Sequence, residues 1–259
     1  MCPEGKPLQT VLEVARERGK STGIVTTDSV TGATPAAFYA HVKNRGQQED
    51  ISGQIVASRI DVALGMGGMN RFVPKTEGQD GREDGRDLTA DAKKRGYDVA
   101  FTLDEMNASS SDRILGLFAG DNVPTLEEMT AKAISVLSKN PRGFFLMSES
   151  SRIDGGGHGN DQVRVVNGTL ELDDALMAAL EFAKADGNTL IVVTADHETG
   201  GMAVQNPNED HPAFCSQWTS KGHSATMVPI YAYGPGAGLF TGTHDNTYIG
   251  ETLRKLSRN

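Results

Sequence analysis

Apolar runs that suit buried β-strands alternate along this chain with amphipathic stretches of helical length. Each apolar run ends in glycine or polar residues, which punctuate the chain between elements. This alternation is typical of an α/β fold, in which helices flank a largely parallel sheet. We therefore expect strands at residues 24–27, 61–64, 98–103, 144–147, 189–194 and 228–233, and helices at 8–15, 37–45, 125–139 and 172–183.

The run at residues 189–194 is the clearest strand, because it is apolar almost throughout. Strands that are buried on both faces of a parallel sheet have this continuous apolar character. The run at 228–233 has the same character. We expect both strands to lie inside the parallel sheet.

Composition excludes several classes of partner. The 259 residues include 34 acidic and 25 basic side chains, which gives a formal net charge of −9. Binding to nucleic acid or to an anionic membrane surface needs clustered Lys and Arg, so neither partner is expected. No apolar run reaches the ~18 residues of a transmembrane helix. The first residues lack the basic and apolar regions of a signal peptide, so the sequence itself indicates no location.

Two polar stretches interrupt the strand and helix pattern. Residues 74–86 are rich in charge and glycine, and residues 200–222 lack a clear period. Polar, glycine-punctuated segments of this kind form surface loops. We interpret both as loop insertions in a single domain that spans residues 1–259.

Acidic and imidazole side chains follow the strand expected at 144–147. Glu149 ends the run, and Asp154 and His158 follow within ten residues, separated from each other by three glycines. In open α/β sheets ligands bind at the carboxyl ends of the strands. A glycine loop would let the two side chains converge on one metal ion, because Asp and His are ordinary zinc ligands. A solvated glycine loop explains this segment equally well.

A second cluster favours the metal site. Asp196 and His197 directly follow the strand at 189–194, and His223 precedes the strand at 228–233. With Glu149, Asp154 and His158 the chain offers three acids and three histidines. These six side chains are more than the four ligands of one tetrahedral zinc ion, so they suit a site with two metal ions.

Segments that contain these residues resemble alkaline phosphatases. The matching segments are residues 26–38, 144–158 and 193–197, in this order, and the similarity extends from about Leu8 to the C-terminus. The resemblance implies an alkaline-phosphatase-like α/β sandwich with a largely parallel central sheet and hydrolysis of phosphate monoesters. It also implies a role for each site residue: zinc ligands Asp154, His158 and His223; second-zinc ligands Asp196 and His197; magnesium ligands Thr34 and Glu149; and a phosphate-binding Arg45.

The family pattern also includes segments that this sequence does not contain. In the family a bridging aspartate and the nucleophilic serine precede the region that matches Leu8. We therefore expect a sandwich that lacks its N-terminal strand or strands, with an incomplete second zinc site and an incomplete magnesium site. Catalysis is expected to be impaired.

Other functions remain open beside this one. The chain would also suit a catalytically inactive module that binds metal or phosphate, or another phosphate- or sulfate-ester enzyme with the same metal core. The expected small-molecule partners are phosphate monoesters and inorganic phosphate. The family resemblance further implies a homodimer and a periplasmic or extracellular location.

Overall fold

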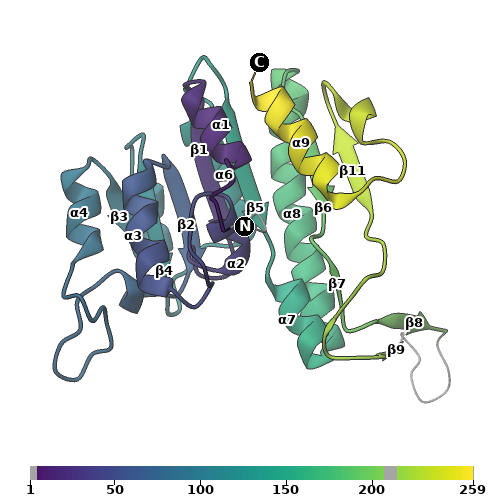
Figure 1. Ribbon diagram of the computed structural model, residues 1–259, viewed down its shortest axis with the longest axis horizontal. Coiled ribbons are helices and arrows are strands. Elements are labelled where there is room, and N and C mark those ends of the chain that lie inside the picture. The colour runs from purple at the N-terminus through teal and green to yellow at the C-terminus, as the bar shows by residue number, and fades with distance from the viewer. Residues whose placement is uncertain (1–4, 207–214, 259) are drawn as a thin grey trace. The chain divides into compact units, whose positions relative to one another are not determined.

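The computed structural model describes residues 5–206 and 215–258. The chain divides into two compact units, one comprising Met1–Glu149 with His244–Asn259 and the other Ser150–Thr243. The first unit contains a parallel sheet, and the second contains two helices with short strand pairs (Figure 1). None of the helices in the described ranges combines the length and the apolar character that crossing a bilayer requires.

The sheet of the first unit is parallel throughout its described strands. Its order is β3-β4-β2-β1-β5. The strands are β1 (Ser21–Thr26), β2 (Val62–Met66), β3 (Asp98–Ala100), β4 (Ile114–Phe118) and β5 (Phe144–Glu149). β1 and β4 are almost wholly buried, which fits strands covered on both faces. The expected α/β class with a largely parallel sheet is confirmed.

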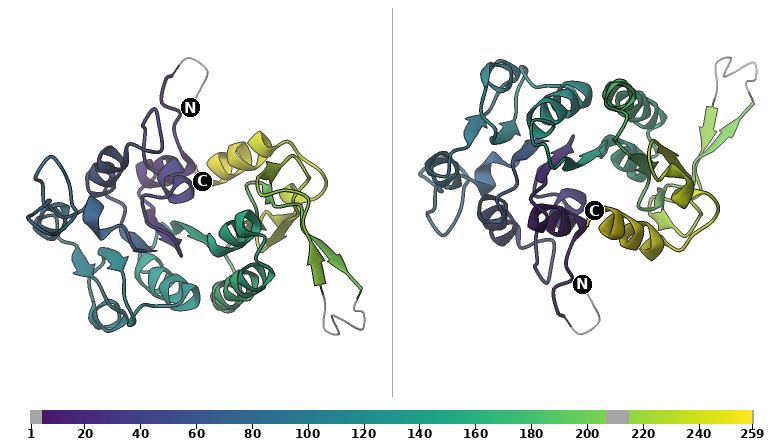
Figure 2. Two further views of the ribbon diagram at one scale, coloured as in Figure 1. Left: turned by 90° about the horizontal axis from the view of Figure 1, so that it is seen from below. Right: turned by 90° about the horizontal axis from the view of Figure 1, so that it is seen from above.

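Helices cover both faces of this sheet, with α6 on the face opposite α1 and α3 (Figure 2). Capping boxes at Thr10 and Thr125 fix where α1 and α6 begin. The apolar core lies between sheet and helices and includes Leu12, Ile24 and Leu115. The helices of this unit are α1 (Val11–Glu17), α2 (Ala33–Ala37), α3 (Gln48–Ser58), 3₁₀-helix η1 (Met69–Arg71), α4 (Leu88–Lys94), α5 (Leu103–Ala108), α6 (Leu126–Leu137) and α9 (Asn246–Ser257).

The helix predicted at residues 37–45 is wrong. α2 ends at Ala37, and the chain from Phe38 to Gln47 is irregular. Side-chain amides take the backbone N–H groups that a helix would have bonded internally: Gln54 accepts from His41, and Gln47 accepts from Lys43 and Asn44. When side-chain oxygens compete with backbone carbonyls for the same N–H groups, the segment favours a loop over a helix.

Two further boundaries differ from the prediction. The strand expected at 98–103 stops at Ala100, because Thr102 accepts the N–H of Glu105 and caps α5. The first helix begins after Thr10, so Leu8 lies outside it and is 55% exposed.

The second unit is built on two consecutive helices. These are α7 (Arg152–Gly159) and α8 (Gln162–Asp186), and α8 begins ten residues before the predicted 172–183. Asp161 caps α8 by accepting the N–H of Arg164, and Gly187 ends it in the left-handed conformation. The remaining elements are β6 (Ile191–Thr194), β7 (Glu198–Thr199), β8 (Ala203–Gln205), β9 (Cys215–Gln217), β10 (His223–Ser224), β11 (Ile230–Tyr233) and η2 (Ala237–Phe240).

The expected parallel placement of the strands at 189–194 and 228–233 is wrong. β6 pairs with β11, and this pair is antiparallel. The other strand pairs of this unit, β7 with β10 and β8 with β9, are antiparallel too. A continuous apolar run indicates burial, but it does not specify the direction of the partner strand.

The two predicted loops contain local pairing. Within 74–86 isolated bridges join Pro74 to Arg82 and Thr76 to Gln79. Within 200–222 the strands β8 and β9 form a hairpin arm, and residues 207–214 lie outside the described part. That these stretches are insertions in one domain stays a prediction.

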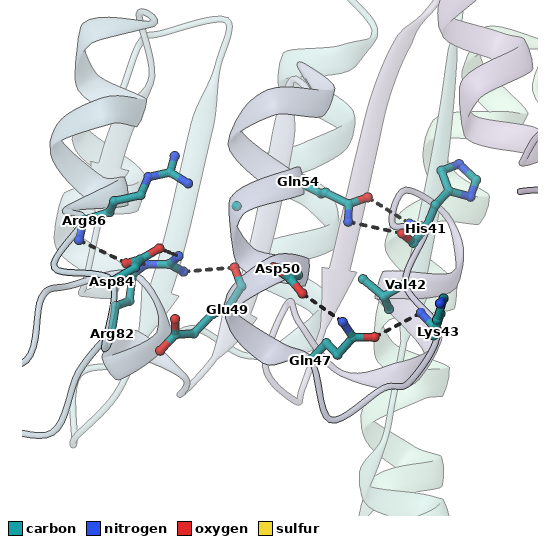
Figure 3. A pocket seen from close by; sticks show the side chains of 11 residues that line it. His41, Val42, Lys43, Gln47, Glu49, Asp50, Gln54, Arg82, Asp84 and Arg86 are labelled. Carbon is teal, nitrogen blue, oxygen red and sulfur yellow. Dashed lines mark hydrogen bonds and ion pairs between the residues drawn. The ribbon is translucent and has the colours of Figure 1, made fainter.

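Arg82 anchors the first of these loops. Its side chain is 2% exposed, and its Nη1 donates to Ser52 Oγ (2.7 Å) and to the carbonyls of Glu49 and Arg71 (both 3.0 Å). Its other nitrogens bind both carboxylate oxygens of Asp84. Arg82 lines a polar pocket of about 730 Å³, in which Gln47 also donates to Asp50 (Figure 3).

We expect Arg82→Ala to lower the free energy of unfolding by about 2–4 kcal/mol, because it removes a buried guanidinium that bonds Ser52, Asp84 and two backbone carbonyls. Hydrogen bonding to Arg82 lowers the pKa of Asp84 to about 2. In the unfolded chain the pKa of an Asp carboxyl is about 3.9. A carboxyl whose pKa is lower in the folded state stabilises the fold at pH values above about 3.9, and this stabilisation is lost as the pH falls toward 2. The cost of Arg82→Ala, measured by urea unfolding, should therefore shrink at pH 3. Arg86→Ala is the control, and an equal cost in both variants would contradict this account.

Candidate metal centre

Asp154 and His158 lie on one face of α7. The glycine loop expected between them is wrong, because residues 152–159 form a helix, in which positions i and i+4 are neighbours. Asp154 Oδ1 and His158 Nε2 are 3.4 Å apart. The glycines serve close packing instead: a Cβ at Gly156 would lie 2.8 Å from the nitrogen of Val165, and one at Gly157 would lie 2.6 Å from the carbonyl of Thr199.

His223 completes a triad with these two residues. It begins β10, which pairs with β7 through His223 and Thr199. Its Nε2 is 3.1 Å from His158 Nε2 and 3.6 Å from Asp154 Oδ1. Within the described ranges this is the one group of three acidic, histidine or cysteine residues whose ligand atoms all lie within 4.8 Å of one another.

The triad fits a tetrahedral zinc ion. Two ligands bound to zinc at about 2.0–2.1 Å and at the tetrahedral angle are about 3.3–3.4 Å apart. The three distances in the triad, 3.1, 3.4 and 3.6 Å, bracket this value. Two imidazole nitrogens and one carboxylate oxygen also match the preference of zinc better than that of calcium or magnesium, which select oxygen ligands.

The imidazole of His158 is held in a ligating orientation. Its Nδ1 lies 2.6 Å from the carbonyl oxygen of Lys221, so Nδ1–H donates there and the lone pair of Nε2 faces the triad. The side chains of the triad are 43–49% exposed. Solvent or a ligand therefore reaches the fourth position of a tetrahedral ion.

Asp196 and His197 form a second group beside the triad. Asp196 Oδ2 and His197 Nε2 are 3.3 Å apart, which again matches one edge of a tetrahedral site. The ring of His197 stacks on that of His223 with a centroid distance of 3.6 Å. The structure thus brings five of the predicted metal ligands together in the second unit.

Thr199 joins the two groups, although no sequence motif singled it out. Its hydroxyl donates to Asp154 Oδ1 (2.6 Å) and lies 3.2 Å from His197 Nδ1. The only signal in the sequence was its place two residues after His197. Side chains that bond to ligands in this way fix ligand orientation.

Glu198 holds the strand pair that presents His223. Its carboxylate accepts the hydroxyl of Ser224 and, at 2.6 Å, the N–H of Gly201. The hydrogen bond from Ser224 holds the pKa of Glu198 below its usual value. The carboxylate therefore ties β10 to the turn after β7.

The remaining predicted residues belong to the first unit. Glu149 ends β5, and its Oε2 accepts the hydroxyl of Thr26 at 2.6 Å. Thr34 lies in the first turn of α2. Arg45 is exposed and lies in the irregular segment before α3, so it is not on a helix as predicted.

Comparison with known proteins identifies the family. The family model "Alkaline phosphatase" matches residues 1–215 and 211–258, nearly the whole chain. The chain belongs to the alkaline phosphatase family. Members of this family are phosphate monoester hydrolases, and the resemblance inferred from the sequence motifs is confirmed.

Individual members of the alkaline phosphatase family cover the chain almost completely. Alkaline phosphatase 4 of Bacillus subtilis is 31% identical over 97% of this chain and 70% of its own length. Alkaline phosphatase of Escherichia coli K12 is 32% identical over 95% of this chain and 66% of its own length. The solved alkaline phosphatase from the Antarctic bacterium TAB5 is 36% identical, with a TM-score of 0.86 over 98% of this chain and 77% of that one.

We expect Thr199→Val to weaken zinc binding about tenfold or more, because it removes the hydroxyl that orients Asp154 and His197. Thr199→Ser keeps the hydroxyl and should retain affinity. Thr169→Val is the matched control, since its hydroxyl bonds only within α8. Competition with a zinc-binding dye measures the affinity. Equal affinity in wild type and Thr199→Val would show that Thr199 does not orient the ligands.

Proposed function

We propose that this chain is a zinc-dependent phosphate monoester hydrolase of the alkaline phosphatase type. The convergence of Asp154, His158 and His223 supports this proposal most strongly, since the three side chains meet in a chain that belongs to this family. A metal-binding triad with half-exposed side chains suits hydrolysis, because substrate and water can both reach the ion.

The proposal assigns a role to each remaining residue. Asp196 and His197 bind a second zinc ion, and Glu149 with Thr34 binds magnesium. Zinc, when bound, supplies a Lewis acid that polarises phosphoryl oxygens. The guanidinium of Arg45 binds two phosphate oxygens, a geometry for which its fork of N–H donors is suited.

Turnover by these 259 residues is proposed to be slow. The family resemblance implies that the bridging aspartate and the nucleophilic serine lie in segments outside these 259 residues. Phosphate binding uses charges that the chain has, whereas fast hydrolysis also needs the nucleophile. A catalytically inactive module that binds metal or phosphate is therefore the second candidate function.

The proposal also includes a homodimer, which light scattering would test, and a periplasmic or extracellular location, which cell fractionation would test.

We expect protein purified without chelator to contain zinc, and His223→Ala to lose most of it, because two ligands of the triad do not make a stable site. His244→Ala removes a histidine of the first unit, whose ring stacks on Tyr248, and should leave zinc unchanged. Elemental analysis measures the content. Equal zinc in wild type and His223→Ala would remove the triad from the proposal.

We expect p-nitrophenyl phosphate to be hydrolysed far more slowly than by a complete alkaline phosphatase, while inorganic phosphate still binds. Arg45→Ala should weaken phosphate binding about tenfold or more, because it removes a bidentate charged donor. Calorimetry with added zinc and magnesium measures the binding, with Lys43→Ala as a control for charge. Fast turnover would contradict the proposed impairment, and phosphate affinity that Arg45→Ala leaves unchanged would exclude Arg45.

A further inference from the structure

A second pocket in the first unit is lined by arginines. Its volume is about 320 Å³, and its lining residues are Val56, Arg59, Arg95, Tyr97 and Arg113. These residues lie near the C-terminal ends of α3 and α4 and just before β2, β3 and β4. The pocket is therefore at the amino-terminal edge of the parallel sheet, whereas Glu149 is at the carboxyl edge.

The charge of this pocket is almost uncompensated. Three of its five lining residues are arginines, and none is acidic, although the whole chain has a net charge of −9. Asp61 approaches only one of them, with 3.7 Å between its Oδ1 and Arg113 Nε, and its other oxygen accepts the N–H of Thr22. Within residues 5–206 and 215–258 no hydrogen bond or ion pair involves the side chains of Arg59 and Arg95.

Capping of the helix ends explains Arg113 but not Arg59 and Arg95. Basic side chains commonly bond the last carbonyls of a helix. Here Arg16 donates to the carbonyl of Ser58 at the end of α3, and Arg113 donates to the carbonyl of Arg95 at the end of α4 (3.3 Å). The capping positions are thus already occupied, and the guanidiniums of Arg59 and Arg95 stay available to a ligand.

The backbone of Arg59 gives independent support. Arg59 has φ of 59° and ψ of 35°, the left-handed conformation that ends a helix. Glycine or asparagine is preferred there, because a side chain is sterically disfavoured. Strained residues of this kind cluster at ligand-binding sites.

We propose that this pocket binds a small anion with two phosphoryl groups. Guanidinium groups bind phosphoryl oxygens bidentately, and three of them balance a trianion. One water molecule occupies roughly 30 Å³ in liquid water. The volume of this pocket is about ten times larger, so it has room for more than one phosphate group. This site uses none of the residues assigned to hydrolysis, so it does not depend on the proposed function.

Calorimetry with methylenediphosphonate tests the proposal, because this diphosphate analogue resists hydrolysis. We expect a binding event that Arg59→Gln with Arg95→Gln weakens at least about tenfold. The control pair, Lys93→Gln with Lys94→Gln, makes the same charge change at the two positions before Arg95, outside the pocket lining, and should keep the affinity. Equal affinity in wild type and the arginine pair would overturn the proposal, as would sulfate binding as tightly as the diphosphonate.

Two further variants separate this site from other causes. Diphosphonates also bind metal ions, so His223→Ala is titrated in parallel: binding that persists there supports the arginine pocket, and binding that disappears overturns it. Arg59→Gly keeps the left-handed backbone without the side chain. It should raise the unfolding midpoint yet weaken binding. An increase in both the unfolding midpoint and the affinity for the diphosphonate would show that Arg59 does not contact the ligand.

Discussion

The ladder of backbone hydrogen bonds that places β1 between β2 and β5 underlies the organisation of the first unit. In this parallel register Thr26 lies opposite both Gly65 and Glu149, so the carboxyl ends of three strands meet at one edge. β1 is buried from Thr22 to Thr26 and has no freedom to slip, since a shift by one residue would exchange its two faces. The hydrogen bond between Thr26 and Glu149 follows directly from this register.

The candidate metal centre of the second unit depends on a different constraint, the close approach of backbones. α7 contains three consecutive glycines, which disfavour a helix by about 1 kcal/mol each relative to alanine. Their absent side chains let Thr199 and Val165 pack directly against the helix. This packing brings the turn after β6 next to Asp154, and the hydroxyl of Thr199 reaches both metal-ligand groups as a result.

Ligands of opposite charge are proposed for the two edges of the sheet in the first unit. Arginines collect at the amino-terminal edge of the sheet around Tyr97, whose burial raises its pKa to about 12 and keeps its hydroxyl protonated as a donor to the carbonyl of Ile60. Glu149 lies at the carboxyl edge. Under the two proposals, the arginine pocket takes an anion and Glu149 takes a cation at opposite edges of one sheet.

The sequence by itself determined the α/β class and most strand positions, and it selected Asp154, His158, Asp196, His197 and His223 as candidate metal ligands, because apolar periodicity and ligand chemistry are local properties. It did not determine that β6 runs antiparallel to its partner or that α7 is a helix. Tertiary structure decided both, since strand direction and glycine packing depend on segments distant in sequence. Only the tertiary structure reveals the contacts of Thr199 and the arginine pocket, because the residues that surround them come from separate helices and strands.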